Sequence, residues 1–377
     1  MGVVATSGFW RRLTRLTMLQ NDQGGFHENR CVDRRRRRHV LTIASLQHAA
    51  AQTPPPRDVP ARTIPVPDTV SPQMQKIIGA PINPNWNVFP KTAAEWKVQV
   101  DAAAAEAAKR LPALREQMRV KLEAMTINGV RAFALTPQDM PAENRNRLLF
   151  HVHGGCYVSN PGESGTSEAT MMAGFGRFKV ISIDYRMPPE AYFPAALDDA
   201  IAVWKAAQSM APARNMAIFG SSAGGGLTLS MVHKIKKDGL PLPGAIAPGT
   251  PMADLTEAGD TFYTNAMIDN VLIARGASCD TRARLYANGH DLKDPLLSPV
   301  YGDMHGFPPT MLLSGTRDLL LSNTVRMHRK LRQAGVESVL EVFEGMAHGG
   351  WYRDASVPES KDAFEEIARF FDKHLGK

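Results

Sequence analysis

Short apolar runs alternate with amphipathic segments through most of the chain after residue 145. The runs predict buried strands at 147–153, 178–185, 216–221, 244–249, 309–315 and 338–345. Apolar residues at helical spacing predict helices at 194–208, 223–237, 324–335 and 361–375. Strands that alternate with helices favour a mostly parallel central sheet flanked by helices on both faces, which is an α/β architecture.

The region before this alternation has a different pattern. Residues 91–125 are rich in Ala, Glu, Lys, Arg and Leu and predict one or two helices, interrupted at Pro112. Two alternating runs follow at 120–127 and 130–136, and Asn128-Gly129 joins them. Asn-Gly between alternating runs is a strong hairpin signal. We therefore expect an antiparallel hairpin at one edge of the sheet.

The composition is that of an ordinary globular protein. Of 377 residues, 44% are hydrophobic and 21% are charged, which is enough for a sizeable core without disulfides or a structural metal. Residues 1–38 hold nine arginines and three acidic residues, so nearly all of the net charge of +7 lies there and we expect no nucleic-acid partner. The three cysteines, Cys31, Cys156 and Cys279, are few and widely spaced, which argues against a disulfide framework and a zinc site.

A basic leader precedes the folded body. Residues 34–52 run from an arginine cluster through a weakly apolar stretch to small residues, which is the order of an export signal. Arg37-Arg38 resembles the pair of a twin-arginine signal. We expect a periplasmic or secreted protein, with a cytoplasmic one as the alternative. The apolar stretch at 40–51 is too short and too polar to span a bilayer, so we expect no integral membrane segment.

The segment 216–226 predicts a nucleophile at the turn from a strand into a helix. Gly220 and Gly224 frame Ser222 in the pattern G-x-S-x-G, in which a serine hydroxyl is exposed above the sheet. Ser221 lacks flanking glycines at the same spacing, so it is not expected to be the nucleophile; it either fills space or also tunes the turn. A glycine-rich tight turn without chemistry is the simpler alternative.

A serine nucleophile needs a histidine base that a carboxylate orients, and in this architecture the chain order is Ser, acid, His. Asp318 and His348 each follow a predicted strand after Ser222. The carboxyl ends of parallel strands meet at one edge of the sheet, so both side chains can converge on the serine. Other histidines lie within predicted helices and are expected to be surface or packing residues: His233, His328 and His374.

The strand at 147–153 ends in His153-Gly154-Gly155-Cys156, which predicts an oxyanion hole. Glycines allow the backbone to approach a substrate closely, and preorganised N–H groups stabilise a developing negative oxygen. The expected donors are the amides of Gly155 and Cys156, in the loop with Gly154, and that of Ala223. His151 and His153 are weak candidates for metal ligands, so we expect no metal site and no cofactor.

Together these motifs resemble the hormone-sensitive-lipase-like (bacterial class IV) esterases of the α/β-hydrolase fold. The resemblance rests on HGGC at 153–156, on DYRMPPEAYFPAALDD at 184–199, on DPLLSPVYGD at 294–303, and on GTRDLL and GMAHGG around Asp318 and His348. It implies the triad Ser222, Asp318 and His348 and a helical cap. Cys156 stands where the family has a third glycine, and Ser221 stands where it often has Asp or Thr.

The residue pattern and the resemblance together give a domain plan, and the resemblance implies an activity. The pattern gives a leader at 1–53 and a proline-rich linker at the start of 54–118. The resemblance adds cap helices in the rest of 54–118 and a catalytic domain at 119–377 with a cap insertion at about 253–293. The activity is hydrolysis of short- to medium-chain carboxylic esters or lactones, small-molecule substrates, through an acyl-enzyme. An amidase or other acyl transferase with the same triad, and a non-catalytic ligand-binding member of the fold, are the alternatives. A homodimer is left open.

Overall fold

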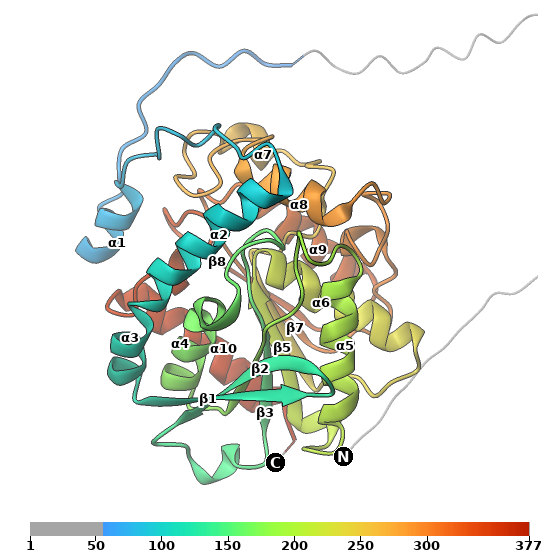
Figure 1. Ribbon diagram of the computed structural model, residues 1–377. Coiled ribbons are helices and arrows are strands. Elements are labelled where there is room, and N and C mark those ends of the chain that lie inside the picture. The colour runs from blue at the N-terminus through green and yellow to red at the C-terminus, as the bar shows by residue number, and fades with distance from the viewer. Residues whose placement is uncertain (1–55, 377) are drawn as a thin grey trace, which may run out of the picture. The chain divides into compact units, whose positions relative to one another are not determined.

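The computed structural model describes residues 56–376, and eight strands form one sheet in it (Figure 1). The strand order across the sheet is β1-β2-β4-β3-β5-β6-β7-β8. The strands are β1 (Val120–Ile127), β2 (Val130–Pro137), β3 (Leu148–Val152), β4 (Val180–Ile183), β5 (Met216–Ser221), β6 (Ala245–Gly249), β7 (Thr310–Gly315) and β8 (Ser338–Phe343).

The pairing within the sheet confirms the predicted mixture of directions. β1 pairs with β2 and β2 with β4 in antiparallel fashion. All later neighbours in the sheet order, β4-β3-β5-β6-β7-β8, pair in parallel. The turn between β1 and β2 has φ 47° at Asn128 and 81° at Gly129, the left-handed backbone that an Asn-Gly hairpin turn needs. The predicted hairpin therefore forms one edge of the sheet.

Helices cover both faces of the sheet, as the alternation predicts. The helices are α1 (Pro72–Ile78), α2 (Ala93–Ala108), α3 (Leu111–Met118), α4 (Ser167–Gly176), α5 (Ala195–Ala207), α6 (Ala223–Lys237), α7 (Thr261–Thr264), α8 (Ser278–Ala287), α9 (Leu321–Gln333) and α10 (Pro358–His374). Neighbouring strand residues point to opposite faces, so Phe150 packs in one core with α5 and α6, and Leu149 packs in another with α4 and α10.

Helix α4 is absent from the sequence prediction. It contacts α10, α3 and β2, and buried residues lie on several sides of it. A helix that is buried all round has no polar face, so the helical period that identifies an amphipathic helix is missing. The missed helix carries Glu168, whose carboxylate accepts hydrogen bonds from Ser221.

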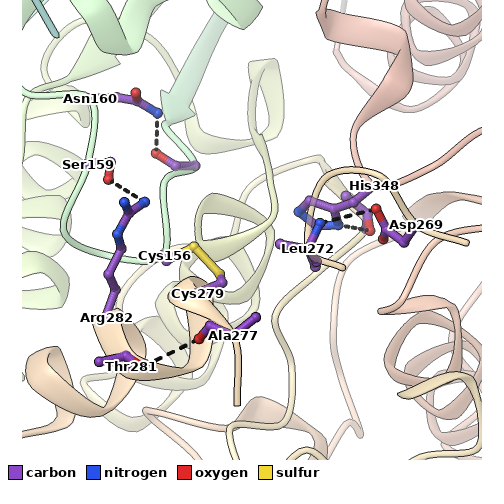
Figure 2. Close-up of a disulfide and its surroundings, with 12 residues drawn as sticks. Cys156, Ser159, Asn160, Asp269, Leu272, Ala277, Cys279, Thr281, Arg282 and His348 are labelled. Atoms are coloured by element: carbon purple, nitrogen blue, oxygen red, sulfur yellow. Dashed lines mark hydrogen bonds between the residues drawn. A yellow bond between two sulfur atoms is a disulfide. The ribbon is translucent and has the colours of Figure 1, made fainter. Parts of the chain in front are cut away.

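The expectation that the cysteines form no disulfide is wrong. Cys156, in the loop after β3, is bonded to Cys279 in the first turn of α8, with Cα atoms 5.4 Å apart (Figure 2). The two residues are 123 positions apart in the chain. Nothing local in the sequence marks such a pair, because only the packing of the insertion at 253–293 over the β3 loop brings them together.

Two of the sequence predictions fall on the leader. The export signal at 34–52 and Cys31 lie outside the described residues. Within the part of the chain that the structure does describe, no helix is both long and apolar enough to cross a membrane.

Candidate active site

Ser222 lies at the sharp turn between β5 and α6. Its backbone has φ 62° and ψ −124°, a strained conformation for a residue other than glycine, and only 3% of the residue is exposed. A Cβ atom at Gly220 or at Gly224 would collide with the carbonyl oxygen of Val152, the last residue of β3. The two glycines of the motif therefore let the turn lie directly against the neighbouring strand.

Asp318 and His348 lie together at the carboxyl ends of β7 and β8, as the strand pattern predicts. His348 Nδ1 is 3.0 Å from Asp318 Oδ1, and both residues are buried. Asp318 accepts further hydrogen bonds from Ser314 Oγ at 2.6 Å and from the Leu320 N–H at 2.9 Å. Burial by itself would raise the pKa of Asp318, but the charge of His348 and the side-chain hydrogen bonds from His348, Ser314 and Thr250 hold it below its ordinary value. The carboxylate is therefore ionised at neutral pH.

The other ring nitrogen of His348 faces a different environment. His348 Nε2 is buried and has no hydrogen-bond partner among the residues that the structure describes. His348 and Ser222 both line one cavity of about 800 Å³. A buried imidazole nitrogen without a partner, next to a cavity that holds a serine hydroxyl, is suited to accept a proton there.

The loop after β3 borders the same cavity, and Gly155 and Cys156 line it. A Cβ atom at Gly154 would lie 2.7 Å from the carbonyl oxygen of Ser221, so the loop touches the nucleophile turn. Gly155 has φ 118° and Cys156 has φ 55°. No hydrogen bond from the N–H groups of Gly155, Cys156 or Ala223 is found to any described residue, so these donors remain available for a ligand.

Thr250 is a site residue that the sequence analysis missed. It follows β6 directly, its hydroxyl donates to Asp318 Oδ2, and the same oxygen is 3.0 Å from His348 Nδ1. Thr250 thus touches both members of the pair. The strand-end rule that found Asp318 and His348 also applies to Thr250, so this residue could have been predicted.

Ser221 takes part in a buried polar network next to Ser222, so its side chain does more than fill space. Its hydroxyl donates to Glu168 Oε1 at 2.5 Å, and its N–H donates to Glu168 Oε2 at 3.2 Å. His151 Nε2 lies 3.2 Å from the same Oε2, and His151 Nδ1 lies 2.9 Å from Ser182 Oγ. The network joins α4, β3, β4 and β5, and the sequence contains no local signal for it.

Asp269 is a second buried carboxylate close to the pair (Figure 2). It accepts hydrogen bonds from the N–H groups of Val271 (2.9 Å), Leu272 (3.1 Å) and Leu319 (2.8 Å). Burial first, and then the charge of Asp318, raise the pKa of Asp269. Asp269 therefore ties the insertion to the loop that carries Asp318.

His153 holds the β3 loop through a hydrogen bond and a ring contact. Its Nδ1 lies 2.8 Å from the carbonyl oxygen of Gly154, and its ring stacks on Tyr185 with centroids 4.1 Å apart. Burial lowers the pKa of His153 to about 4, so the ring is neutral at physiological pH.

Several regions besides the β3 loop line the cavity. Among the apolar lining residues, Leu111 and Leu114 belong to α3, Val271 and Leu272 to the insertion, and Met171 to α4. The N-terminal helices and the insertion at 253–293 thus border the site, where the resemblance places a cap.

Comparison with known proteins agrees with this geometry. Residues 149–352 match the family model described as alpha/beta hydrolase fold. The crystal structure of an esterase is 41% identical and has a TM-score of 0.82, covering 85% of this chain and 99% of that one. The crystal structure of an esterase from the bacterial hormone-sensitive lipase family is 26% identical with a TM-score of 0.70, covering 81% and 99%.

Curated relatives carry similar descriptions. An acetyl-hydrolase from Streptomyces hygroscopicus is 29% identical over 63% of this chain and 79% of its own length. An esterase from Acinetobacter venetianus is 27% identical over 67% of this chain and 82% of its own. The chain therefore belongs to the alpha/beta hydrolase fold family and, within it, to the hormone-sensitive-lipase-like esterases.

Proposed function

We propose that the protein is a serine carboxylesterase in which Ser222, His348 and Asp318 act as the catalytic triad. One observation carries the proposal: His348 is held by Asp318 through Nδ1 and presents an unpartnered Nε2 beside the cavity that Ser222 lines. The descriptions of the relatives as esterases and acetyl-hydrolase support the same reaction class. The presence of His348 disfavours the alternative of a non-catalytic binding protein.

The proposed reaction passes through an acyl-enzyme. Ser222 Oγ attacks the ester carbonyl carbon while His348 Nε2 takes the hydroxyl proton. The resulting oxyanion accepts hydrogen bonds from the free N–H groups of Gly155, Cys156 and Ala223. His348 returns the proton to the leaving alcohol, and the acyl group remains on Ser222. Water then attacks the acyl carbon and gives a proton to His348. As the bond between the acyl carbon and Ser222 Oγ breaks, His348 returns that proton to Ser222 Oγ, and the carboxylic acid leaves.

The cavity suits a substrate of modest size. About 800 Å³ lies within the usual range for small-molecule sites. Together with the apolar walls from α3 and the insertion, this volume fits short- to medium-chain acyl esters or lactones. The triad alone does not select esters over amides, because both reactions share the tetrahedral intermediate.

A panel of 4-nitrophenyl esters of increasing chain length, simple lactones and a matched anilide tests the proposal. We expect ester turnover in the wild type and a loss of at least about 1,000-fold in Ser222→Ala, with Ser209→Ala as an exposed control. A fluorophosphonate probe should label the wild type and not Ser222→Ala. Undiminished turnover in Ser222→Ala would refute the mechanism, and faster anilide turnover would favour an amidase.

We also propose that the protein is exported. The disulfide between Cys156 and Cys279 supports export, because such bonds persist mainly in oxidising compartments. The Arg37-Arg38 pair in the leader is the proposed signal. Replacing both with lysine should leave the esterase in the cytoplasm of a bacterial host, as measured by fractionation. Unchanged export of that variant would contradict the proposed signal.

A further inference from the structure

Arg282 occupies an unusual position for an arginine. It lies on α8 and lines the cavity that holds Ser222 and His348. Its side chain extends from α8 toward the loop after β3, where Nη1 donates to Ser159 Oγ at 3.1 Å (Figure 2). The guanidinium also lies over the ring of Trp96 on α2, 5.0 Å from the centroid. Arg282 thus stands where the cap, the insertion and the β3 loop meet.

The charge of Arg282 is not balanced by the described part of the chain. No carboxylate of a described residue lies within 4.0 Å of it, and its Nε is buried with no hydrogen-bond partner. Burial lowers the pKa of Arg282, and no anion counteracts that effect. Arg284, two positions away on the same helix, is exposed and lies 2.9 Å from Asp280. The helix therefore pairs its exposed arginine and leaves the one in the cavity unpaired.

Most of the other charged residues of the cavity are also positive. Arg110 and Arg353 also line it, and both are exposed. Asp354 is the single acidic residue among the described lining, and its Oδ1 already accepts hydrogen bonds from the Ser356 N–H at 2.8 Å and from Ser356 Oγ at 2.7 Å. A concave site with three arginines and one engaged carboxylate attracts an anion.

We propose that the substrate is an ester that carries a carboxylate group, and that Arg282 binds this carboxylate while the ester carbonyl lies at Ser222. The inference rests on the proposed esterase function. A carboxylate matches the planar fork of a guanidinium and can accept two parallel hydrogen bonds from it. An interaction between a partly buried cation and a ligand anion is also stronger than the same pair in water.

The carboxylate can belong to the acyl half or to the alcohol half of the ester, and two pairs of substrates separate these cases. The acyl pair is the mono-4-nitrophenyl ester of adipic acid and the same ester with its free carboxylate converted to an amide. The alcohol pair is 4-acetoxybenzoate and 4-acetoxybenzamide. Within each pair the size is nearly constant and only the charge changes.

The measured quantity is the ratio of kcat/KM for the carboxylate substrate to that for its amide partner. We expect a ratio of about 10 or more in one pair for the wild type, and a decrease of that ratio by about 10- to 100-fold in Arg282→Gln. Arg282→Lys keeps the charge and should retain part of the ratio. Arg284→Gln on the same helix is the matched control and should keep the wild-type ratio.

The ratio separates recognition from a structural role. If Arg282 only holds the cap against the β3 loop, Arg282→Gln will lower turnover of both partners together and leave the ratio unchanged, which would overturn the inference. A wild-type ratio near 1 in both pairs would overturn it as well, even if Arg282→Gln fails to fold, and the esterase function would then stand without it. Inactivity on all four substrates would contradict the proposed function and, with it, this inference.

Discussion

Breaking the disulfide between Cys156 and Cys279 should destabilise the protein and disturb the active site together. The bond closes a loop with a sequence separation of 123 residues, for which the chain-entropy relation gives about 5 kcal/mol. Measured losses on removing native disulfides are about 2–5 kcal/mol, so we expect roughly 3–5 kcal/mol for Cys279→Ala. For a folded unit of roughly 300 residues, this loss corresponds to a decrease in Tm of about 5–8 °C.

The bond also holds a site element, and this gives the prediction a second readout. Cys156 carries one of the proposed oxyanion donors, and Cys279 lies in the first turn of the helix that carries Arg282. Without the bond, the first turn of α8 is free to move away from the β3 loop. We therefore expect Cys279→Ala to lower kcat/KM for a 4-nitrophenyl ester by about 10-fold, since small displacements of positioned groups reduce rates strongly.

The assay uses urea unfolding followed by tryptophan fluorescence, with and without reductant, in a Cys31→Ser background. Reductant should destabilise the parent and leave Cys279→Ala unchanged. Cys156→Ala, Cys279→Ala and the double variant should lose similar free energies of unfolding, because each removes the same bond. Thiol titration of the denatured, unreduced parent should find no free thiol. Two free thiols, or a parent whose midpoint is unaffected by reductant, would refute the reasoning.

Two further predictions concern the groups around the nucleophile. Asp318→Asn should lower kcat by about 1,000- to 10,000-fold because His348 loses its orienting carboxylate. Because the pKa of Asp318 is lowered in the folded state, its contribution to stability is present at neutral pH and is lost as pH falls through that pKa. The free energy of unfolding should therefore fall less steeply with decreasing pH below pH 4 in Asp318→Asn than in the wild type. Ser221→Ala should lower the free energy of unfolding measured in urea by about 2 kcal/mol, because Glu168 loses a buried hydrogen-bond donor. The fluorophosphonate should still label Ser222 in this variant. Loss of labelling would identify Ser221 as the nucleophile.

The candidate triad shows which site residues local sequence patterns can predict. Ser222 was found from the glycine frame, and Asp318 and His348 from their places after predicted strands. These signals are local, because a turn pressed against a neighbouring strand excludes side chains at Gly220 and Gly224 whatever the rest of the chain does. The parallel sheet then brings strand ends to one edge, so the approximate location of all three residues follows from the strand assignment.

The remaining features of the site depend on packing between distant segments. By itself the sequence determined the strands, most of the helices, the hairpin at Asn128-Gly129 and the nucleophile turn, since each leaves a local pattern of burial or backbone conformation. Only the tertiary structure decided that Cys156 meets Cys279, that Ser221 donates to Glu168, and that Arg282 lies in the cavity without a counter-charge. A residue carries no local mark of a partner more than fifty positions away, because that contact forms only when the helices and the insertion pack on the sheet.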